Sequence, residues 1–538
     1  MSRRRWGLGA FALASVVTLT LAGCSQSSEG PATGNGGDTA AIISTNGNEP
    51  QSPLITFGTT EVGGGKILTS IYAGLVSYEA DGAIKNEVAK SIESDDNVTW
   101  TITVADGWKF TNGEAITAKT FVDTWTAAAK DDNGAYWFSS FAGMPDDQTA
   151  GTPSGLEATG DMTFTVTLKA ADADFPLRLG YTAYMPLPSV AFEDMEAFGE
   201  NPIGNGPYML DGKGAWRHDE GINLVKNPDY KGVREVANGG LNIVFYTSLE
   251  SAYADAQGGN LDVLDTVPDT AFATYATDFP DRSVNQPAAI YQGFNVPFYL
   301  DHFGQDEEGQ LRRAAISMAI NRKEITDTIF QGTRTPATDF TSPVVEGWSD
   351  SLPGSEVLDY DPEAAKAKWA EAEAISPYTG TFKIAYNSDG GHQAWVDAVV
   401  NSISNTLGIK AEGEPFPTFA AALDKRTTGT LDGATRAGWQ ADYPSQGNFL
   451  SAQYSTGASS NYEGYSNPDF DAKLKEAAAA SSPEEAAKQY EEAQVLLMKD
   501  LPSIPLWYAN AVGVWGEGVD NVKFGWDSVP LYNAVTKG

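Results

Sequence analysis

Cysteine and histidine are nearly absent from this sequence of 538 residues. With Cys24 as the single cysteine, no disulfide and no cysteine cluster can form within the chain. The three histidines are His218, His302 and His392, and no two of them share the close spacing of zinc or nickel ligands. We therefore expect no metal centre, no redox site and no cofactor.

Positive charge is also scarce. Lysine and arginine total 35 against 71 acidic residues, which gives a formal net charge of −36. Nucleic acids are bound by clustered basic side chains, and beyond the first five residues the sequence has no such cluster. We therefore exclude nucleic acid as a partner. Acidity of this degree is typical of a solvated surface that keeps a protein soluble.

Short catalytic motifs are missing as well. The sequence contains no G-x-S-x-G elbow, no P-loop and no H-E-x-x-H, and the glycines at 63–65 lack the spacing of a phosphate cradle. The chain is therefore not expected to be an enzyme. A secreted hydrolase such as a glycosidase remains the alternative, since a pair of catalytic carboxylates has no readable spacing among 71 acids.

The amino terminus combines a positive start, an apolar stretch and a small-residue end. Three arginines at 3–5 precede the apolar residues 6–21, and Leu-Ala-Gly-Cys closes the segment at Cys24. This order is typical of a bacterial lipoprotein signal peptide, residues 1–23, with Cys24 as the lipidated residue. An uncleaved membrane anchor is the alternative, and the arginines leave the export route, Sec or Tat, open.

Residues 24–39 predict a flexible tether. They are rich in Gly and Ser, and about 15 residues of this kind reach roughly 20 Å. No later window offers about 18 uninterrupted apolar residues, so no further membrane span is expected. The prediction is a globular part held on the extracytoplasmic face of a bacterial cell membrane by a lipid on Cys24.

Periodicity predicts a mixed α/β organisation. Residues 98–104 and 163–168 alternate apolar and threonine side chains, which is the pattern of half-buried strands. With a helix at about 118–129 between them, they predict a small α+β lobe near 63–202.

Helical signals dominate the later half. Helical spacing continues through 311–325, and Ser482, Pro483 and two acids predict the start of another helix. Strand candidates at 382–386 and 433–439 interleave with these helices and indicate an α/β lobe with a mixed sheet.

One long motif carries a family resemblance. Residues 432–471 read R-A-G-W-x-A-D-Y, then N-F-L, then N-Y-x-G-Y-S-N-P-D-F-D, and this order resembles the oligopeptide-binding branch of bacterial extracellular solute-binding proteins. Further blocks in the family's order are NGNEPQS at 46–52, YAGL at 72–75, WKFTNGEAITA at 108–118, GNGPY at 204–208, GFN at 293–295 and LRRAAISMAINR at 311–322.

The resemblance implies an α/β fold of the periplasmic-binding-protein-like type, class II: two lobes joined by a hinge, plus an extra domain. Ligand would lie between the lobes and be enclosed when they close. The implied boundaries are 40–62, 203–290 and 506–538 for a discontinuous domain I, 63–202 for domain II, and 291–505 for domain III.

The resemblance also implies roles for charged residues at the two ends of a bound peptide. Asp442 matches the position that pairs with the peptide's ammonium group, whereas Arg426, Arg436 and His392 match positions that receive its carboxylate. Without the resemblance, a turn-capping Asp and ordinary surface arginines are the simpler interpretation.

Main-chain pairing and aromatic pockets complete the implied site. An extended peptide would pair through its main chain with one wall at 438–440 and face an opposing wall at 49–51. Such pairing does not depend on the peptide's side chains. The residues of these walls are Gly438, Trp439, Gln440, Glu49, Pro50 and Gln51. Candidates for lining side-chain pockets are Trp439, Tyr291, Phe294, Trp507 and Tyr508, with core packing as the alternative for each.

Spacing gives a length for the cargo. If 436–442 is extended, Asp442 and Arg436 lie roughly 20 Å apart, which suits about three to five peptide residues. The expected partners are short peptides and the permease and ATPase subunits of an ABC transporter, with the chain itself a monomer. Another cargo on the same fold, such as an oligosaccharide, remains open.

Overall fold

The computed structural model describes residues 39–538 except 60, 389–390 and 459. The predicted signal peptide and Cys24 lie outside the described residues. Within the described part, no helix combines the length and the apolarity needed to cross a bilayer.

A mixed sheet of twelve strands runs through the molecule in the order β16-β15-β17-β13-β18-β12-β1-β11-β10-β8, with β14 beside β18 and β9 beside β10. The parallel pairs are β1 with β11 and β12, and β15 with β16 and β17. The strands are β1 (Ile42–Gly47), β8 (Tyr208–Leu210), β9 (Trp216–Arg217), β10 (Gly221–Lys226), β11 (Gly240–Phe245), β12 (Val263–Leu264), β13 (Ser283–Asn295), β14 (Arg334–Pro336), β15 (Thr381–Asn387), β16 (Lys410–Phe416), β17 (Ala434–Gln440) and β18 (Ser503–Trp515).

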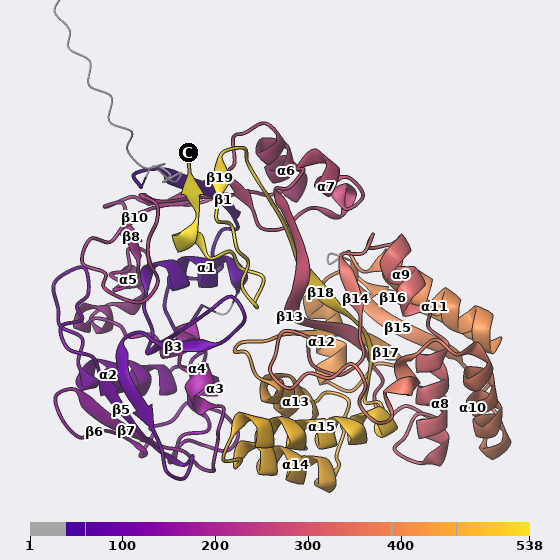
Figure 1. The fold of residues 1–538 in the computed structure, drawn as a ribbon. Coiled ribbons are helices and arrows are strands. Elements are labelled where there is room, and N and C mark those ends of the chain that lie inside the picture. The colour runs from indigo at the N-terminus through magenta and orange to yellow at the C-terminus, as the bar shows by residue number, and fades with distance from the viewer. Residues whose placement is uncertain (1–38, 60, 389–390, 459) are drawn as a thin grey trace, which may run out of the picture. The chain divides into compact units, whose positions relative to one another are not determined.

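Two long antiparallel strands, β13 and β18, join the halves of this sheet (Figure 1). Near Val514, β18 also pairs with β12, whereas β13 pairs with β17 from Ile290 onward. Their register shifts between Pro287 and Tyr291, where the sheet passes from one half to the other. The implied boundaries at 290/291 and 505/506 fall inside these two strands and stay a prediction.

Residues 63–202, called the small lobe below, contain a separate antiparallel sheet in the order β4-β5-β7-β6. The predicted strands and helix are confirmed as β5 (Thr99–Val104), β7 (Thr163–Thr167) and α2 (Ala118–Ala129), because alternation buries one face of each strand against the helix. The other elements of this part of the chain are α1 (Val62–Ile71), β2 (Val76–Tyr78), β3 (Ile84–Asn86), β4 (Ala89–Glu93), α3 (Ala135–Phe138), β6 (Leu156–Ala158), α4 (Phe175–Arg178) and α5 (Met195–Gly199).

Residues 291–505, called the helical lobe, carry most of the longer helices. The predicted cap is confirmed: the Ser482 side chain accepts from the Glu485 N–H and Pro483 opens α15. The continuous helix predicted through 311–325 is wrong, because α8 ends at Met318 and Asn321 caps a new helix, α9. The helices are α8 (Glu307–Met318), α9 (Arg322–Thr328), α10 (Pro362–Ile375), α11 (Gln393–Leu407), α12 (Phe419–Thr427), α13 (Gln446–Tyr454), α14 (Pro468–Ala478) and α15 (Pro483–Asp500).

Two large hydrophobic cores hold most of the structure together. One core unites the small lobe with β1, β10 and β11 and includes Ile43, Trp100 and Leu241. Another packs α6 (Leu249–Gln257), α7 (Tyr275–Asp278) and α11 against β15 and β18, around residues such as Val396 and Ile504. Phe294 of β13 and Ile504 of β18 belong to this second core, and the two strands continue from it into the half that contains β12. A pair of long strands that passes from one half to the other suits a hinge.

Candidate ligand-binding site

Asp442 lies directly after β17 and is held in place by Asn448. The Asp442 N–H donates to Asn448 Oδ1 at 3.0 Å, and Asn448 Nδ2 donates to Asp442 Oδ2 at 3.1 Å. Trp439 Nε1 donates to the same Asn448 oxygen at 2.9 Å. Asn448 is positioned in turn by the first turn of α13, whose N-cap is Ser445. The carboxylate therefore has a fixed orientation.

The Asp442 carboxylate is half-buried and lacks a charged partner. Burial raises its pKa to about 6, against the opposing effect of the Asn448 hydrogen bond. Among the described residues, no lysine, arginine or histidine forms an ion pair with it. A carboxylate in this situation gains most from a cation brought by a ligand.

Two cavities meet at Asp442 and Tyr181, where the helical lobe faces the small lobe, and the second also borders residues outside both lobes, at 59–62 and 526–529. The first has a volume of about 190 Å³ and is lined by Tyr136, Trp137, Ser139, Gln148, Arg178, Tyr181, Tyr184, Asp442, Tyr443, Gly447, Asn448, Ser451, Ala452 and Ala458. The second has a volume of about 240 Å³ and is lined by Thr59, Glu61, Val62, Gly65, Lys66, Thr69, Tyr78, Gly180, Tyr181, Thr182, Gln440, Ala441, Asp442, Trp526, Asp527 and Val529.

In the second cavity, the cation Lys66 has a charged partner, whereas the carboxylates of Asp442 and Asp527 form no ion pair with a described residue. Lys66 is already engaged, because its ammonium group binds the buried Asp265 and donates to Asn46 O at 3.1 Å. Asp527 Oδ1 accepts a 3.0 Å hydrogen bond from the Val529 N–H, and no described lysine, arginine or histidine forms an ion pair with it. Burial raises the pKa of Asp527 to about 6. The negative charge of Asp442 and Asp527 thus dominates this cavity.

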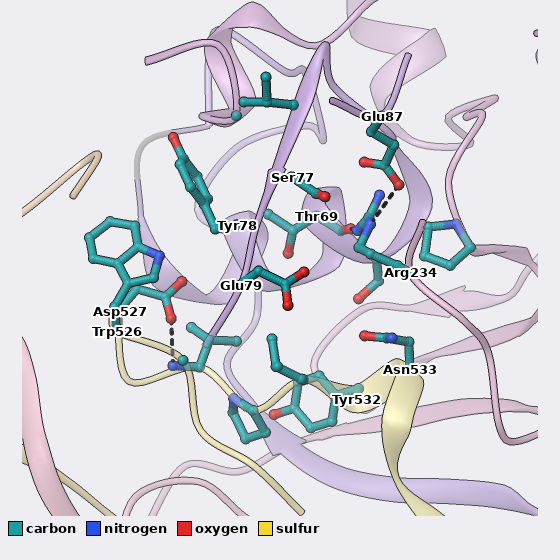
Figure 2. A pocket seen from close by; sticks show the side chains of 18 of the residues that line it. Thr69, Ser77, Tyr78, Glu79, Glu87, Arg234, Trp526, Asp527, Tyr532 and Asn533 are labelled. Atoms are coloured by element: carbon teal, nitrogen blue, oxygen red, sulfur yellow. Dashed lines mark hydrogen bonds and ion pairs between the residues drawn. The ribbon is translucent and has the colours of Figure 1, made fainter. Parts of the chain in front are cut away.

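A third cavity of about 110 Å³ adjoins the second and shares Trp526 and Asp527 with it. Figure 2 shows Tyr78, Trp526 and Asp527 at one end of this space and Glu87 with Arg234 at the other. Arg234 Nε donates to Glu87 Oε1 at 2.9 Å, so the one arginine lining it is neutralised within the protein. This cavity presents no uncompensated cation to a ligand.

The backbone of β17 has an open edge beside Asp442. One edge pairs with β13 from Asn295 to Ile290, whereas β15 covers the other only at Ala434 and Thr435. Within the described ranges, no strand pairs with that second edge at 436–440. The Ala441 N–H donates to Ala289 O, so the backbone of Ala441 faces β13. Because the backbone direction alternates along a strand, the N–H and C=O groups of residues 438 and 440 face the open edge.

The residues predicted to receive a carboxylate lie outside these cavities and already have partners. Arg426 Nη2 forms a 3.0 Å ion pair with Glu463 Oε1. On β17, Arg436 Nε donates to Asn387 Oδ1 at 2.9 Å. His392, at the start of α11, accepts a 3.1 Å hydrogen bond from the Trp395 indole. A ligand carboxylate here would have to share or replace these interactions.

The predicted opposing wall follows β1. Glu49 binds His218 Nδ1 at 2.8 Å and accepts the Asp219 N–H at 3.0 Å, so its carboxylate is turned toward that loop. Pro50 is buried and Gln51 is exposed. None of these three lines the two cavities at Asp442.

Four aromatic residues predicted to line pockets are instead fully buried core residues: Tyr291, Phe294, Trp507 and Tyr508. The polar ones find partners inside the protein, with Trp507 Nε1 donating to Gln292 and the Tyr508 hydroxyl donating to Asp339 at 2.7 Å. The long strands β13 and β18 that carry them are covered on both faces, which is why packing replaces pocket lining. Trp439 is half-buried and bonded to Asn448.

Sequence reasoning missed the small-lobe wall of the site. Tyr136 and Trp137 lie on the four-residue helix α3, and Tyr181 follows α4 in a loop. Neither segment matches a functional motif. Only the tertiary fold brings them to Asp442, some 300 residues further along the chain.

A twelve-stranded sheet whose halves are joined by two long strands, with cavities where two lobes face each other, defines a class II periplasmic-type solute-binding fold, as predicted. The chain belongs to the bacterial extracellular solute-binding proteins of family 5: the description of that family's middle region matches residues 83–461. Among the described residues, no group of three or more His, Cys, Asp or Glu side chains is arranged to hold a metal ion.

Relatives and solved structures agree on this family and fold. The periplasmic murein peptide-binding protein MppA of Escherichia coli (strain K12) is 26% identical over 483 residues, 86% of this chain and 87% of that protein. The oligopeptide-binding protein OppA of Bacillus subtilis (strain 168) is 25% identical over 548 residues, 97% of each chain.

Among solved structures, the unliganded open form of MppA aligns with a TM-score of 0.77 and 21% identity, covering 93% of this chain and 98% of that one. Haemophilus influenzae OppA in complex with RPPGFSPFR aligns with a TM-score of 0.74 and 22% identity, covering 93% and 99%. These likenesses show the fold.

Proposed function

We propose that this protein captures short peptides of about three to five residues between its lobes and delivers them to an ABC importer. The observation that carries the proposal is the Asp442 carboxylate, which lines both cavities, forms no ion pair with any described residue and adjoins the open edge of β17. An α-ammonium group would neutralise Asp442, while the peptide backbone pairs with Gly438 and Gln440. Such pairing is independent of side-chain identity.

The relatives support a peptide cargo. MppA is named as a murein peptide-binding protein, OppA as an oligopeptide-binding protein, and the aligned Haemophilus influenzae OppA structure holds the peptide RPPGFSPFR. An oligosaccharide would offer no ammonium group to Asp442, so the site favours peptide over that alternative.

The carboxylate end of the peptide is assigned to Arg436, with Arg426 and His392 available for other lengths. Arg436 lies on β17 itself, six residues before Asp442, so an extended peptide along this strand would bring its carboxylate near that guanidinium. Glu49, Pro50 and Gln51 would form the opposing wall of the cleft, and opening and closing would be a hinge motion of β13 and β18.

Membrane attachment completes the proposal. A lipid on Cys24 and the tether at 24–39 would hold the monomer at the extracytoplasmic face of the cell membrane, near the permease and ATPase subunits. In this role the protein binds and releases its cargo without chemistry, so it would not act as an enzyme.

Calorimetry with three forms of one tetrapeptide tests the proposal. Unmodified tetra-alanine should bind in the micromolar range or tighter, and N-acetylation, which removes the positive charge, should weaken binding at least tenfold. C-terminal amidation should weaken it less, since Arg426, Arg436 and His392 already have partners within the protein and gain less from a ligand's charge. Equal affinity for the free and acetylated peptides would contradict the role of Asp442.

Mass spectrometry of ligands that copurify with the protein separates the alternatives. Peptides support the proposal, oligosaccharides contradict it, and cleavage products accumulating with time would indicate a hydrolase.

A further inference from the structure

The cavity of about 190 Å³ beside Asp442 is surrounded by aromatic rings from both lobes. Four rings come from the small lobe, and Tyr443 comes from the loop that follows β17. The small-lobe rings are Tyr136, Trp137, Tyr181 and Tyr184. Because these rings belong to two lobes, the cavity is complete only when the lobes are together.

The small-lobe rings are fixed by contacts with one another. Trp137 packs on Tyr181 with ring centres 4.4 Å apart and on Tyr136 at 5.0 Å. The Tyr184 hydroxyl donates to Trp137 O at 2.6 Å. A wall that is already ordered loses little further conformational entropy when a ligand packs against it.

The opposite wall is ordered by an arginine. The guanidinium of Arg178 lies 5.3 Å from the ring centre of Tyr443 and forms a 2.5 Å ion pair with Asp172. Apart from Asp442, Arg178 is the one charged residue that lines this cavity. Asp172 neutralises Arg178, so Asp442 is the carboxylate in this lining that a ligand's cation would meet.

The two cavities at Asp442 differ in what a ligand would meet. Gln440 and Ala441, at the end of the open strand edge, line only the 240 Å³ cavity. If a peptide binds Asp442 through its ammonium group and pairs with β17, its backbone therefore runs from Asp442 through the 240 Å³ cavity. The first side chain of such a peptide can then enter the aromatic cavity, because Asp442 lines that cavity as well.

Resting on the proposed function, we propose that the aromatic cavity is a selectivity pocket for the first side chain of the peptide, and that it favours an aromatic residue there. A cavity of about 150 Å³ is known to hold a benzene ring, so about 190 Å³ accommodates a phenylalanine side chain. Ring-to-ring contacts with Trp137 and Tyr181 reward an aromatic guest beyond its buried area. A small first residue leaves the cavity unfilled, and a basic one brings a second cation to a place where Asp442 is already taken by the peptide's own ammonium group.

Calorimetry on the purified full-length protein compares Phe-Ala-Ala-Ala, Ala-Ala-Ala-Ala and Lys-Ala-Ala-Ala. These peptides share the backbone, both termini and the length. The Phe peptide should bind about ten- to a hundredfold more tightly than the Ala peptide, from burial of one aromatic side chain. The Lys peptide should bind no more tightly than the Ala peptide.

Two substitutions change the cavity in opposite ways. Tyr181→Ala removes one ring and should reduce the Phe-to-Ala preference several-fold. Ser451→Trp, at an exposed position of α13, fills the cavity and should bring the preference close to one. Tyr360→Ala is the matched control, because that ring is 45% exposed and lines neither cavity, so the preference should persist.

Equal affinity for the Phe and Ala peptides overturns the inference and leaves the proposed function standing. So does a preference for the Lys peptide, or a Phe preference that Ser451→Trp leaves intact. Failure of all three peptides to bind overturns the proposed function and this inference together.

Discussion

The Tyr490 hydroxyl donates a 2.8 Å hydrogen bond to Asp174 Oδ2, which joins helix α15 of the helical lobe to the small lobe. The Ser445 hydroxyl donates to the same oxygen. A third link is the Ala173 N–H, which donates to Ala478 O at 2.8 Å. These contacts lie beside the cavities at Asp442 without lining the 240 Å³ space, so they stabilise the approach of the lobes without contacting a ligand on the β17 edge.

Removing one of these contacts should weaken peptide binding from outside the site. If peptide binds the form in which the lobes are together, its apparent Kd rises as that form becomes less populated. Tyr490→Phe deletes a single hydrogen bond to a carboxylate and should raise the apparent Kd by about tenfold. Calorimetry with tetra-alanine measures the change.

Small-angle scattering supplies the second measurement for Tyr490→Phe. Without peptide, the variant should have a larger radius of gyration than the parent protein. Tyr360→Phe, at an exposed ring, is the control and should change neither quantity. An unchanged Kd in Tyr490→Phe would show that this contact has no part in closure.

Asp442→Asn should make the protein more stable and unable to bind free peptides well. The pKa of Asp442 is raised to about 6, so its ionised form is disfavoured in the fold. That penalty is absent below about pH 4, the ordinary pKa of an aspartate, and complete above about pH 6. Asn keeps an oxygen for Asn448 and removes the charge, which should raise the free energy of unfolding by on the order of 1–2 kcal/mol at pH 7.

Two measurements check that Asp442→Asn gains stability and loses peptide affinity. Thermal unfolding at pH 7 should give a higher Tm for Asp442→Asn, with the difference disappearing near pH 4. Calorimetry at pH 7 should show at least a tenfold loss of peptide affinity. Asp350→Asn, an equal charge change at an exposed position, should do neither. A lower Tm at pH 7 would contradict the interpretation that burial destabilises the ionised Asp442 carboxylate.

Peptide affinity should fall as the solution becomes acidic. Binding needs the ionised carboxylate, and a pKa of about 6 leaves about nine-tenths of Asp442 ionised at pH 7 and about one-tenth at pH 5. The Kd should therefore rise about tenfold between these pH values. Binding near pH 6 should also release protons, since the ammonium group lowers the pKa of Asp442, and calorimetry in buffers of different ionisation enthalpy detects them.

Asp527 must be separated from Asp442 in this experiment, because its pKa is also raised to about 6 and both line the 240 Å³ cavity with Glu61 and Lys66. Asp527→Asn should retain the pH dependence of binding, whereas Asp442→Asn should lose it. If the dependence follows Asp527 instead, that carboxylate is the one that meets the ammonium group.

Local patterns in the sequence were sufficient for several elements of the fold. Alternation placed β5 and β7 within a residue or so of their ends, and Ser482 with Pro483 marked the start of α15. The helical spacing over 311–325 predicts one helix, but the Asn321 side chain caps a second helix, α9. The first helix therefore ends before Asn321, although the spacing of apolar residues continues past it. Capping competes with periodicity there, and the cap prevailed.

The site was only partly accessible from the sequence. The long motif around Asp442 marks it as a site residue, yet its neighbours Tyr136, Trp137 and Tyr181 belong to no motif and reach it only through tertiary folding. The same limit applies to Tyr508, whose hydroxyl finds Asp339, 169 residues away in the sequence, and so becomes a core residue. Residue type alone does not separate an aromatic that lines a cavity from one that fills a core.

The buried ion pair of Lys66 and Asp265 should be essential to the wall that α1 contributes to the site. Their side chains are 6% and 8% exposed, and Asp265 also accepts hydrogen bonds from Asn46 Nδ2 at 2.8 Å and the Tyr532 hydroxyl at 3.1 Å. Burial alone would raise the pKa of Asp265, but Lys66 and these donors bring it below the usual value. The stability that this pairing provides is therefore present at neutral pH and lost as the pH falls below about 4.

Lys66→Met should lower the free energy of unfolding by about 3–5 kcal/mol at pH 7, because it leaves Asp265 buried without its cation. Lys85→Met is the matched control: its partner Glu79 lies at 2.9 Å, both side chains are about half exposed, and the loss should stay below about 1 kcal/mol. Denaturant unfolding of both variants measures the two values. Adding Asp265→Asn to Lys66→Met should recover part of the stability, since it removes the uncompensated charge. A Lys66→Met variant as stable as Lys85→Met would mean that Asn46 and Tyr532 alone satisfy Asp265.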